Sequence, residues 1–260
     1  MYLCVEERDY AGCVGSGISV GWTHYFEYPS MEKVYDFFHG EDSLNDSGQS
    51  YCIGSIQYQI NCIFGGSNLF IYEKDSNILI EKRNLTCIDG EQLRILGITG
   101  AGNVLYLGAM NYPSYDKQGI FTYEIDDTLN TNNRANLRLT LTSVPSGLSR
   151  KGNILYYVSQ DDDQLHIVDI SGNPVSVPDA WWQYSAVTLP EDGVDHYRGC
   201  IVIGSEIIVG NVTACKLHWI NLNSYTEVSQ FDFSSYLHDQ TNKLYGVWKT
   251  TQDGLISRFF

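Results

Sequence analysis

Basic residues are scarce in this chain of 260 residues: 16 Lys and Arg stand against 31 Asp and Glu, which gives a net charge of -15. Nucleic-acid affinity comes mostly from Lys and Arg that neutralise phosphates, so this balance argues against a nucleic-acid partner. It argues equally against adhesion to an anionic membrane surface. An acidic balance fits a soluble particle kept apart by charge repulsion, or one that docks on a basic protein partner.

Long apolar runs are missing as well. None approaches the roughly 18 residues that a membrane-spanning helix requires. The N-terminus, Met1 to Asp9, has neither the basic segment nor the apolar segment of a signal peptide. We therefore expect no membrane partner and a chain that is cytoplasmic in origin, with a virion as the alternative final location.

Cysteine pairs with metal-ligand spacing do not occur. No CxxC is present and the six His are scattered, so we expect no structural zinc site, no other metal and no cofactor. An odd number of cysteines spread along strands is typical of buried free thiols in a reducing compartment. The seven cysteines are Cys4, Cys13, Cys52, Cys62, Cys87, Cys200 and Cys215.

Catalytic signatures are absent from the sequence: there is no GxSxG elbow, no GxGxxG turn and no P-loop. Glu191-Asp192 and Asp195-His196 could be interpreted as an acid/base cluster of the kind that sugar hydrolases use, although nothing in the sequence shows that these side chains converge. Such an enzyme needs two carboxylates about 5–10 Å apart across its substrate, and a solvated loop is the simpler interpretation. We expect no enzymatic activity, and a glycoside hydrolase is the enzymatic alternative.

What the chain does have is an internal repeat. The starts of five similar apolar strands are separated by 46, 51, 45 and 52 residues. A period of roughly 40–50 residues predicts a β-propeller with four strands in each blade. The 19 Tyr and 24 Gly agree, because aromatic residues interrupted by turn residues favour strands. The five strands are Thr23–Ser30, Leu69–Ser76, Ile120–Asp127, Leu165–Gly172 and Leu217–Ser224.

The segments between these repeats are mostly predicted as loops. Gly40–Gln49 and Ala135–Pro145 are expected to connect blades without forming strands. Ser30–Phe37 is either a short helix or a strand. No Pro- and Ser-rich linker divides the chain, so we predict an all-β fold with one propeller domain over residues 1–260.

The chain ends half-way through a repeat, with Leu244–Lys249 and Gly254–Phe260 as two further strands. Open sheet edges invite aggregation, so we expect these strands to join N-terminal strands in one composite blade. Pairing with Thr23–Phe38 gives five blades, which we favour. If residues 1–20 supply their own pair of strands, there are six blades. Residues 1–20 could instead form an N-terminal arm or part of the closing blade.

Clustered aromatic residues are the best candidates for binding. Trp181, Trp182 and Tyr184 follow a Pro-bounded loop, where exposed rings stack on a sugar or anchor a protein partner. Adjacent residues of a strand face opposite sides, so one Trp is expected to pack inward and the other to be exposed. Together with Tyr197 these residues form the predicted binding set.

Three histidines fall at matching positions of the repeat, second in the strands that begin at Thr23, Leu165 and Leu217. Equivalent positions in different blades could converge on a central channel and bind a metal. Structural equivalence encoded by the repeat is the more economical interpretation for His24, His166 and His218. Asp161-Asp162-Asp163 is similarly interpreted as a solvated hairpin tip rather than a cation site.

One part of the chain carries a family resemblance. LHIVDI at 165–170 is followed by Trp181 or Trp182, by His196-Tyr197-Arg198-Gly199, and by LHWINLNSY at 217–225. On these points Ile154–Tyr225 resembles the propeller part of tail nozzle and tail-accessory proteins of short-tailed phages. The resemblance implies a non-enzymatic virion component that assembles in a ring and docks other protein subunits. A carbohydrate-binding, lectin-like propeller is the alternative.

Overall fold

The computed structural model describes residues 1–9, 21–38, 50–53, 55–63, 66–73, 78–125, 133–143, 145–159, 162–171, 182–190, 197–239 and 242–250. Within these ranges the chain forms strands and one short 3-10 helix, η2 (Ser234–Tyr236). None of the described helices is long and apolar enough to cross a membrane.

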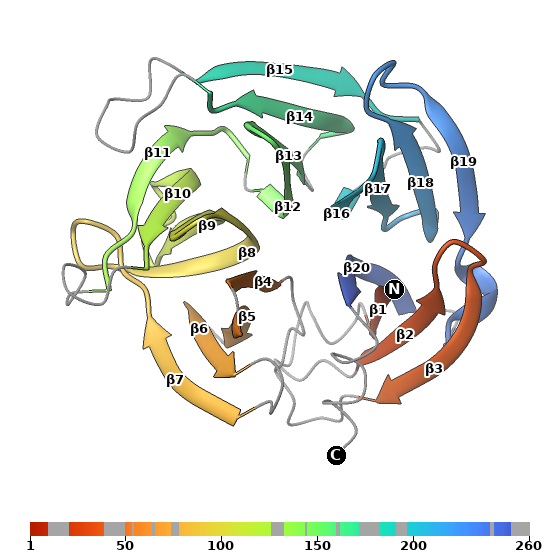
Figure 1. The fold of residues 1–260 in the computed structure, drawn as a ribbon, viewed down its shortest axis with the longest axis horizontal. Coiled ribbons are helices and arrows are strands. Elements are labelled where there is room, and N and C mark those ends of the chain that lie inside the picture. The colour runs from red at the N-terminus through yellow and green to blue at the C-terminus, as the bar shows by residue number, and fades with distance from the viewer. Residues whose placement is uncertain are drawn as a thin grey trace.

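The strands form five antiparallel sheets of four strands each, arranged around a common centre (Figure 1). Four sheets are built from consecutive strands. They are β4 (Ser50–Ile53), β5 (Ile56–Ile63), β6 (Gly66–Glu73) and β7 (Ile78–Asn84); β8 (Gln92–Ala101), β9 (Val104–Tyr112), β10 (Gln118–Glu124) and β11 (Asn136–Thr140); β12 (Pro145–Lys151), β13 (Ile154–Ser159), β14 (Gln164–Asp169) and β15 (Gln183–Thr188); β16 (Tyr197–Ile203), β17 (Glu206–Asn211), β18 (Lys216–Asn221) and β19 (Glu227–Asp232). The first strand of each lies nearest the centre and the last lies at the rim, which confirms the prediction of an all-β propeller.

The fifth sheet joins the two ends of the chain. Its order is β20 (Asn242–Thr250), β1 (Tyr2–Asp9), β2 (Gly21–Glu27) and β3 (Glu32–Phe38). The composite sheet agrees with the prediction. Within it β1 lies between the C-terminal strand and the strands at Thr23–Phe38, so the described N-terminal residues are part of the closing sheet, one of the alternatives left open for residues 1–20. The N-terminal residues thus supply one strand, and Gly254–Phe260 lies outside the described residues.

One segment predicted as a connection, and one predicted as either helix or strand, form strands in the structure. Ala135–Pro145, predicted as a loop, contains β11, the outermost strand of its sheet. The prediction was wrong because Asn136–Thr140 is short and mostly polar, as a strand with one exposed edge can be. Ser30–Phe37, for which helix and strand were both open, contains most of β3. Gly40–Gln49 lies outside the described residues.

Glycines allow the innermost strands to approach one another backbone to backbone. A Cβ on Gly97 of β8 would lie 2.9 Å from the amide nitrogen of Leu148 on β12. A Cβ on Gly147 of β12 would lie 2.5 Å from the Cα of Gly199 on β16. Each of these glycines coincides with a shift of register in its sheet, which marks a β-bulge. The bulges turn the inner strands and let neighbouring sheets pack closely around the centre.

Apolar side chains fill the space between neighbouring sheets. One cluster includes Leu3 and Val5 of β1 together with Ile208 of β17, and so joins the closing sheet to its neighbour. A second joins the sheets that contain β10 and β14. Burial of this kind holds sheets face to face without any long-range covalent link.

Four cysteines belong to this core as buried free thiols: Cys4, Cys87, Cys200 and Cys215. Burial raises the pKa of the Cys200 thiol, so it remains protonated and behaves as a small apolar group. For these four the prediction of buried thiols is confirmed. The side chains of the other three lie outside the described residues.

Candidate functional site

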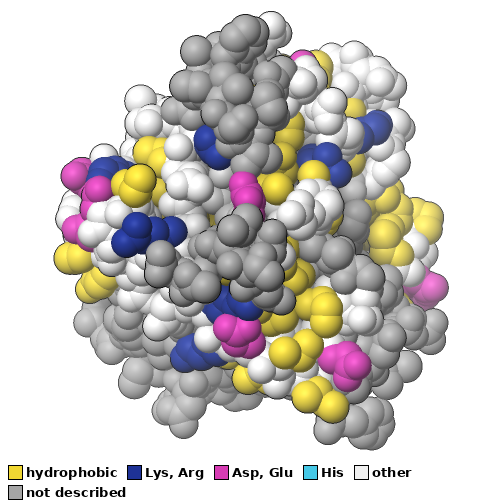
Figure 2. All heavy atoms as spheres, turned by 60° about the vertical axis from the view of Figure 1, so that its left-hand side comes forward, with side chains coloured by type: hydrophobic (Ala, Val, Ile, Leu, Met, Phe, Trp, Pro, Cys, Tyr) yellow, Lys and Arg dark blue, Asp and Glu magenta, His cyan; other side chains and the backbone are white. Residues whose placement is uncertain are grey.

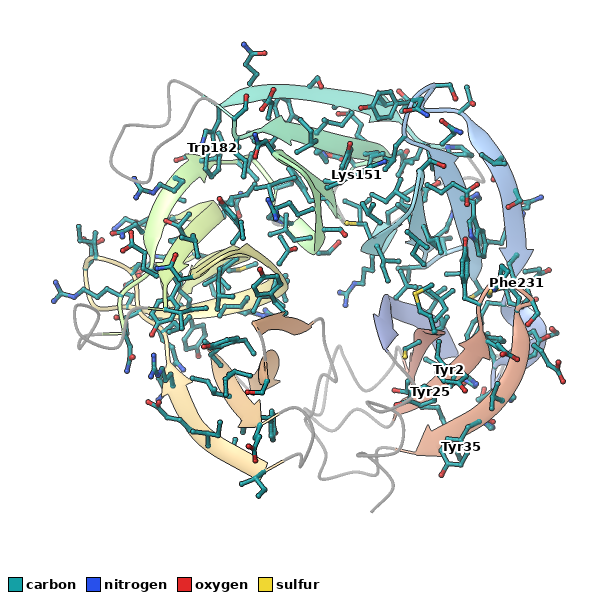
Figure 3. All side chains as sticks on the ribbon, viewed as in Figure 1. Tyr2, Tyr25, Tyr35, Lys151, Trp182 and Phe231 are labelled. Carbon is teal, nitrogen blue, oxygen red and sulfur yellow. The ribbon has the colours of Figure 1, made fainter. Side chains whose placement is uncertain are left out.

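Two of the predicted binding aromatics lie in the core. Trp182 is only 8% exposed and packs beside Tyr106, with ring centroids 6.3 Å apart (Figure 3). Tyr197 has no exposed area, and its hydroxyl donates a hydrogen bond to the carbonyl of Pro190. Tyr197 and Trp182 are therefore not available for the predicted surface contacts, because both side chains fill space between sheets. For Trp182 this agrees with the expectation that one of the two adjacent Trp residues packs inward. Trp181 lies outside the described residues.

Tyr184 is the member of the predicted set that reaches the surface. It lies on β15, a rim strand, and is 50% exposed. Its hydroxyl forms a 2.5 Å hydrogen bond with Nδ1 of His166 on the neighbouring strand β14. The hydroxyl therefore has a structural partner, and the exposed face of the ring is what remains for contact with another molecule.

The three repeat-related histidines are anchored within their own sheets. Each is buried on the third strand of a sheet, and its Nδ1 lies within hydrogen-bonding distance of a side chain on the fourth strand. The repeat therefore places a histidine in the same structural role in three sheets, and each of the three pairs with a different side chain of its own sheet. The pairs are His24–Asp36 at 2.8 Å, His166–Tyr184 at 2.5 Å and His218–Glu227 at 2.7 Å.

The acidic hairpin tip also has a structural role where the structure describes it. Asp162 accepts a hydrogen bond from the amide of Gln164 at 3.1 Å and lies 2.9 Å from Nε2 of His166. Its carboxylate closes the turn and fixes the histidine, as a short acidic side chain commonly does. Asp161 and the acid/base cluster at 191–196 lie outside the described residues.

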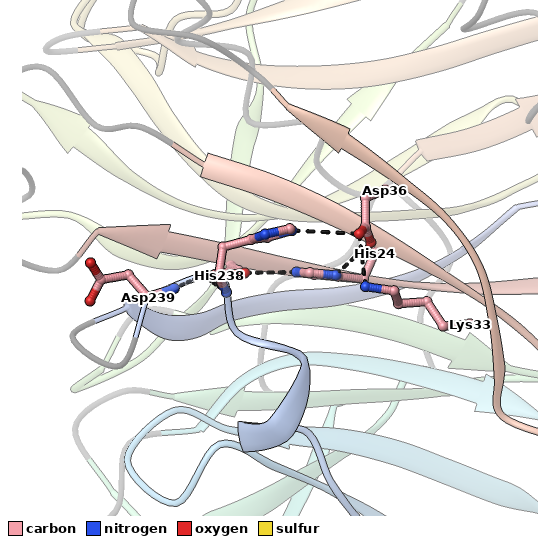
Figure 4. A network of polar contacts seen from close by, with 6 residues as sticks. His24, Lys33, Asp36, His238 and Asp239 are labelled. Atoms are coloured by element: carbon pink, nitrogen blue, oxygen red, sulfur yellow. Dashed lines mark hydrogen bonds and ion pairs between the residues drawn. The ribbon is translucent and has the colours of Figure 1, made fainter.

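His24 differs from His166 and His218 because it belongs to a larger polar cluster (Figure 4). Glu7 on β1, His24 on β2 and Asp36 on β3 meet on one face of the closing sheet. Asp36 lies directly opposite His24, and Glu7 lies diagonally across from it. Nε2 of His24 is 2.8 Å from Oε2 of Glu7, and both side chains are fully buried. Three strands thus place two carboxylates against one imidazole.

His238 completes this polar cluster from the loop that follows η2. The other Glu7 oxygen, Oε1, accepts hydrogen bonds from the backbone amides of His238 and Asp239, at 2.8 and 3.4 Å. The His238 ring stacks on Trp22, with centroids 3.8 Å apart, and lies 5.3 Å from the ring of His24. Its Nε2 is 3.5 Å from Oδ2 of Asp36. The cluster therefore connects the N-terminal strand to the loop that leads into the C-terminal strand.

Asp36 is held in its ionised form within the cluster. Burial alone would favour the neutral acid and raise the pKa of Asp36. A hydrogen bond from Lys33 at 2.7 Å and the charges of His24 and Lys33 outweigh this effect, so the pKa of Asp36 is below its ordinary value. The carboxylate thus remains an acceptor for Nδ1 of His24.

A different feature lies at the rim, on β7. Ile78, Leu79 and Ile80 are 60, 48 and 54% exposed, although successive side chains of a strand point to opposite faces. β7 has a neighbouring strand on one side only among the described strands. On this side of the molecule apolar and basic side chains lie next to one another (Figure 2). Three adjacent exposed aliphatic residues form a patch typical of interaction surfaces.

No protein-family model and no curated protein matches the chain. Among solved structures it is similar to a chain in the crystal structure of a nidogen/laminin complex, at 12% identity over 95% of this chain and 97% of that chain, with a TM-score of 0.54. It is also similar to the Myceliophteria thermophila Cps50 (Swd1) β-propeller domain, at 11% identity over 72% of this chain and 56% of that chain, with a TM-score of 0.44.

A third similar structure is apo AztD from Citrobacter koseri, at 13% identity over 88% of this chain and 59% of that chain, with a TM-score of 0.42. At such identities the comparison with the nidogen/laminin complex shows the fold alone. Together with the five sheets it defines the class of the protein, a β-propeller. No phage-specific resemblance is shown.

Proposed function

We propose that this chain is a five-bladed, non-enzymatic propeller that binds a protein partner through the rim strand β7. The observation that carries the proposal is the exposure of Ile78, Leu79 and Ile80, side by side at the edge of a sheet. The fold supports it, since the similar nidogen/laminin structure is a complex between proteins. The four buried free thiols support folding in a reducing compartment.

The exposed patch on β7 is large enough to matter energetically. Full burial of one Ile or Leu side chain is worth about 1.5–3 kcal/mol, and these residues are about half exposed. Each of these side chains that a partner covers would contribute about 1 kcal/mol, which corresponds to roughly fivefold in affinity. Burial of these side chains against an apolar partner surface is therefore more favourable than their exposure to water.

Site-specific photo-crosslinking in the cells that produce the protein tests this proposal. A photoreactive amino acid at Ile80 is expected to give one adduct of defined mass, which the double substitution Ile78→Ser/Leu79→Ser removes. Val228 is the matched control, because it is 54% exposed on β19, the rim strand of another sheet. An adduct of twice the chain mass would identify the partner as a second copy. Equal adducts from both positions, or none, would refute the proposal.

A narrower proposal places the propeller in a phage virion. It rests on the sequence resemblance of Ile154–Tyr225 alone, and it requires several copies to assemble in a ring. The mass of the purified protein, measured by light scattering behind a sizing column, tests it: a discrete multimer favours a ring, and a monomer at all concentrations counts against one. The carbohydrate-binding alternative loses support because Trp182 is buried.

A further inference from the structure

The polar cluster of the closing sheet brings together three side chains that commonly bind transition metals. Glu7, His24 and His238 each place one ligand atom so that all three atoms lie within 4.8 Å of one another. Histidine nitrogens and carboxylate oxygens are the ligands that zinc uses in catalytic and mixed sites. The three residues come from β1, β2 and the loop after η2, so only the closed ring assembles them.

The hydrogen-bonding capacity of His24 shows why a cation fits between these groups. Both ring nitrogens of His24 lie 2.8 Å from a carboxylate oxygen, one from Glu7 and one from Asp36. A neutral imidazole has one N–H, and ionised carboxylates only accept hydrogen bonds. These contacts are satisfied either by the imidazolium form, which donates from both nitrogens and carries the charge that acts on Asp36, or by a cation at one of the two contacts. A metal ion between Nε2 and Glu7 satisfies the lone pairs of both ligand atoms at once.

Asp36 supplies the orientation that a metal-binding histidine needs. A histidine that ligates a metal almost always donates its other N–H to a carboxylate or carbonyl, which fixes the tautomer and the ring. Nδ1 of His24 meets Oδ1 of Asp36 in this way, and Lys33 holds the second oxygen of Asp36. With Nδ1 carrying the proton, the lone pair of Nε2 is directed at Glu7.

The distances require small adjustments of all three ligands. Zinc binds nitrogen and oxygen at about 2.0–2.2 Å, so two ligand atoms of a tetrahedral ion lie about 3.3 Å apart. The Nε2–Oε2 separation of 2.8 Å is that of a direct hydrogen bond, so Glu7 and His24 must move about 0.5 Å apart to admit an ion. The His238 ligand atom lies within 4.8 Å of the other two, so His238 must also adjust to reach the ion. It lies in a loop, and its side chain is 35% exposed, so it is the ligand nearest to solvent.

From this geometry we propose that Glu7, His24 and His238 bind one Zn²⁺ ion, with Asp36 as the residue that orients His24. This site is independent of the proposed protein-binding function of β7. The ion would connect β1 to the loop that precedes β20, which are 231 residues apart at the Glu7–His238 contact. Since the unfolded chain does not assemble these ligands, zinc would stabilise the closed ring.

Calorimetric titration of the full-length, chelator-treated protein with zinc chloride tests the site. We expect one ion per chain, and a melting temperature that rises with zinc concentration. His238→Ala should weaken zinc binding at least tenfold and abolish the thermal shift. Glu7→Gln should do the same, because the amide oxygen still accepts the backbone hydrogen bonds but the negative charge is lost. Asp239→Asn is the control in the same loop, and its affinity should remain within about twofold of the wild type.

X-ray absorption of the zinc-loaded protein gives an independent readout. The expected first shell contains nitrogen and oxygen at about 2.0–2.1 Å and no sulfur. The proposal would be overturned by the absence of zinc binding, by sulfur ligands from cysteine, or by wild-type affinity in the His238→Ala variant. His238 is exposed, so its substitution remains informative even if the buried Glu7 variant fails to fold.

Discussion

The close approach of the innermost strands predicts that Gly147 tolerates no side chain. In Gly147→Ala the new Cβ would lie 2.5 Å from the Cα of Gly199 and 2.6 Å from the amide nitrogen of Cys200. Both atoms belong to the backbone of β16, so no side-chain rotation relieves the contact. Either β12 or β16 must move away from the other, and the packing between two sheets must change with it.

The expected cost follows from two opposing effects. Forcing an extra carbon into a packed region typically costs about 1–3 kcal/mol. Replacing Gly by Ala also reduces the conformational entropy of the unfolded chain, which stabilises the folded state by about 0.4–1 kcal/mol. Gly147→Ala should therefore reduce the free energy of unfolding by about 1–2 kcal/mol, and lower the melting temperature by roughly 2–8 °C in a chain of this size.

Two further glycines separate crowding from backbone strain. Gly152 has a φ of +59° with no atom within 4 Å of a new Cβ, so Gly152→Ala adds strain alone. That strain destabilises the folded state by about 1–2 kcal/mol, and the lower entropy of the unfolded chain offsets part of it. The free energy of unfolding should therefore fall by less than about 1.5 kcal/mol. Gly199 combines a φ of +72° with a Cβ that would meet the backbone and side chain of Val247. Gly199→Ala should be the most destabilising of the three, at about 2–4 kcal/mol.

Urea unfolding of the three variants, followed by near- and far-UV circular dichroism, measures these differences. The two signals must coincide for the free energies to be comparable. The predicted order of destabilisation is Gly199→Ala, then Gly147→Ala, then Gly152→Ala. If the free energy of unfolding of Gly147→Ala lies within about 0.5 kcal/mol of the wild-type value, β12 and β16 do not make the close backbone contact that predicts the loss.

Two further predictions concern buried aromatic side chains. Trp182→Ala should destabilise the protein by about 3–5 kcal/mol in urea, whereas Ile88→Ala, at an exposed position, should change stability by less than about 0.5 kcal/mol; equal effects would contradict the burial of Trp182. Burial, with a smaller effect of Tyr225, raises the pKa of Tyr156 to about 12, so the native state retains a proton that the unfolded state loses near pH 10. Stability should therefore fall as the pH rises from 10 to 12, and Tyr156→Phe should reduce the difference in melting temperature between pH 9 and pH 11; an unchanged difference would contradict the assignment.

Much of the fold could be predicted because the third strand of every sheet is strongly apolar. Those strands are buried between sheets, so their composition repeats, and the repeat predicts a propeller. β11 was missed because it lies at the rim, where only one side is paired and polar residues suffice. The place of β1 could not be fixed either, because its partner β20 lies at the opposite end of the chain and no local pattern records the pairing.

The candidate sites were harder to predict, for a physical reason in each case. The local sequence around an aromatic residue beside a loop does not reveal whether its side chain packs inward, as Trp182 does, or points outward, as Tyr184 does. Glu7 and His238 carry no spacing signal, because their approach depends on how the ring closes. The matching positions of His24, His166 and His218 were visible, but only the structure shows that His24 alone has a second carboxylate and a second histidine beside it.

The closing sheet explains why the polar cluster can serve for binding rather than for closure. Joining chain ends about 230 residues apart costs on the order of 5 kcal/mol in loop entropy. Four apolar side chains at this junction are fully or almost fully buried in the hydrophobic core: Leu3, Val5, Leu244 and Val247. The burial of each contributes about 1.5 kcal/mol or more, which together offsets the entropic cost. Ring closure therefore does not depend on the charge of Glu7. The Glu7→Gln variant is expected to keep its ring closed, so a loss of zinc affinity in a folded variant would report the loss of a ligand and not the opening of the ring.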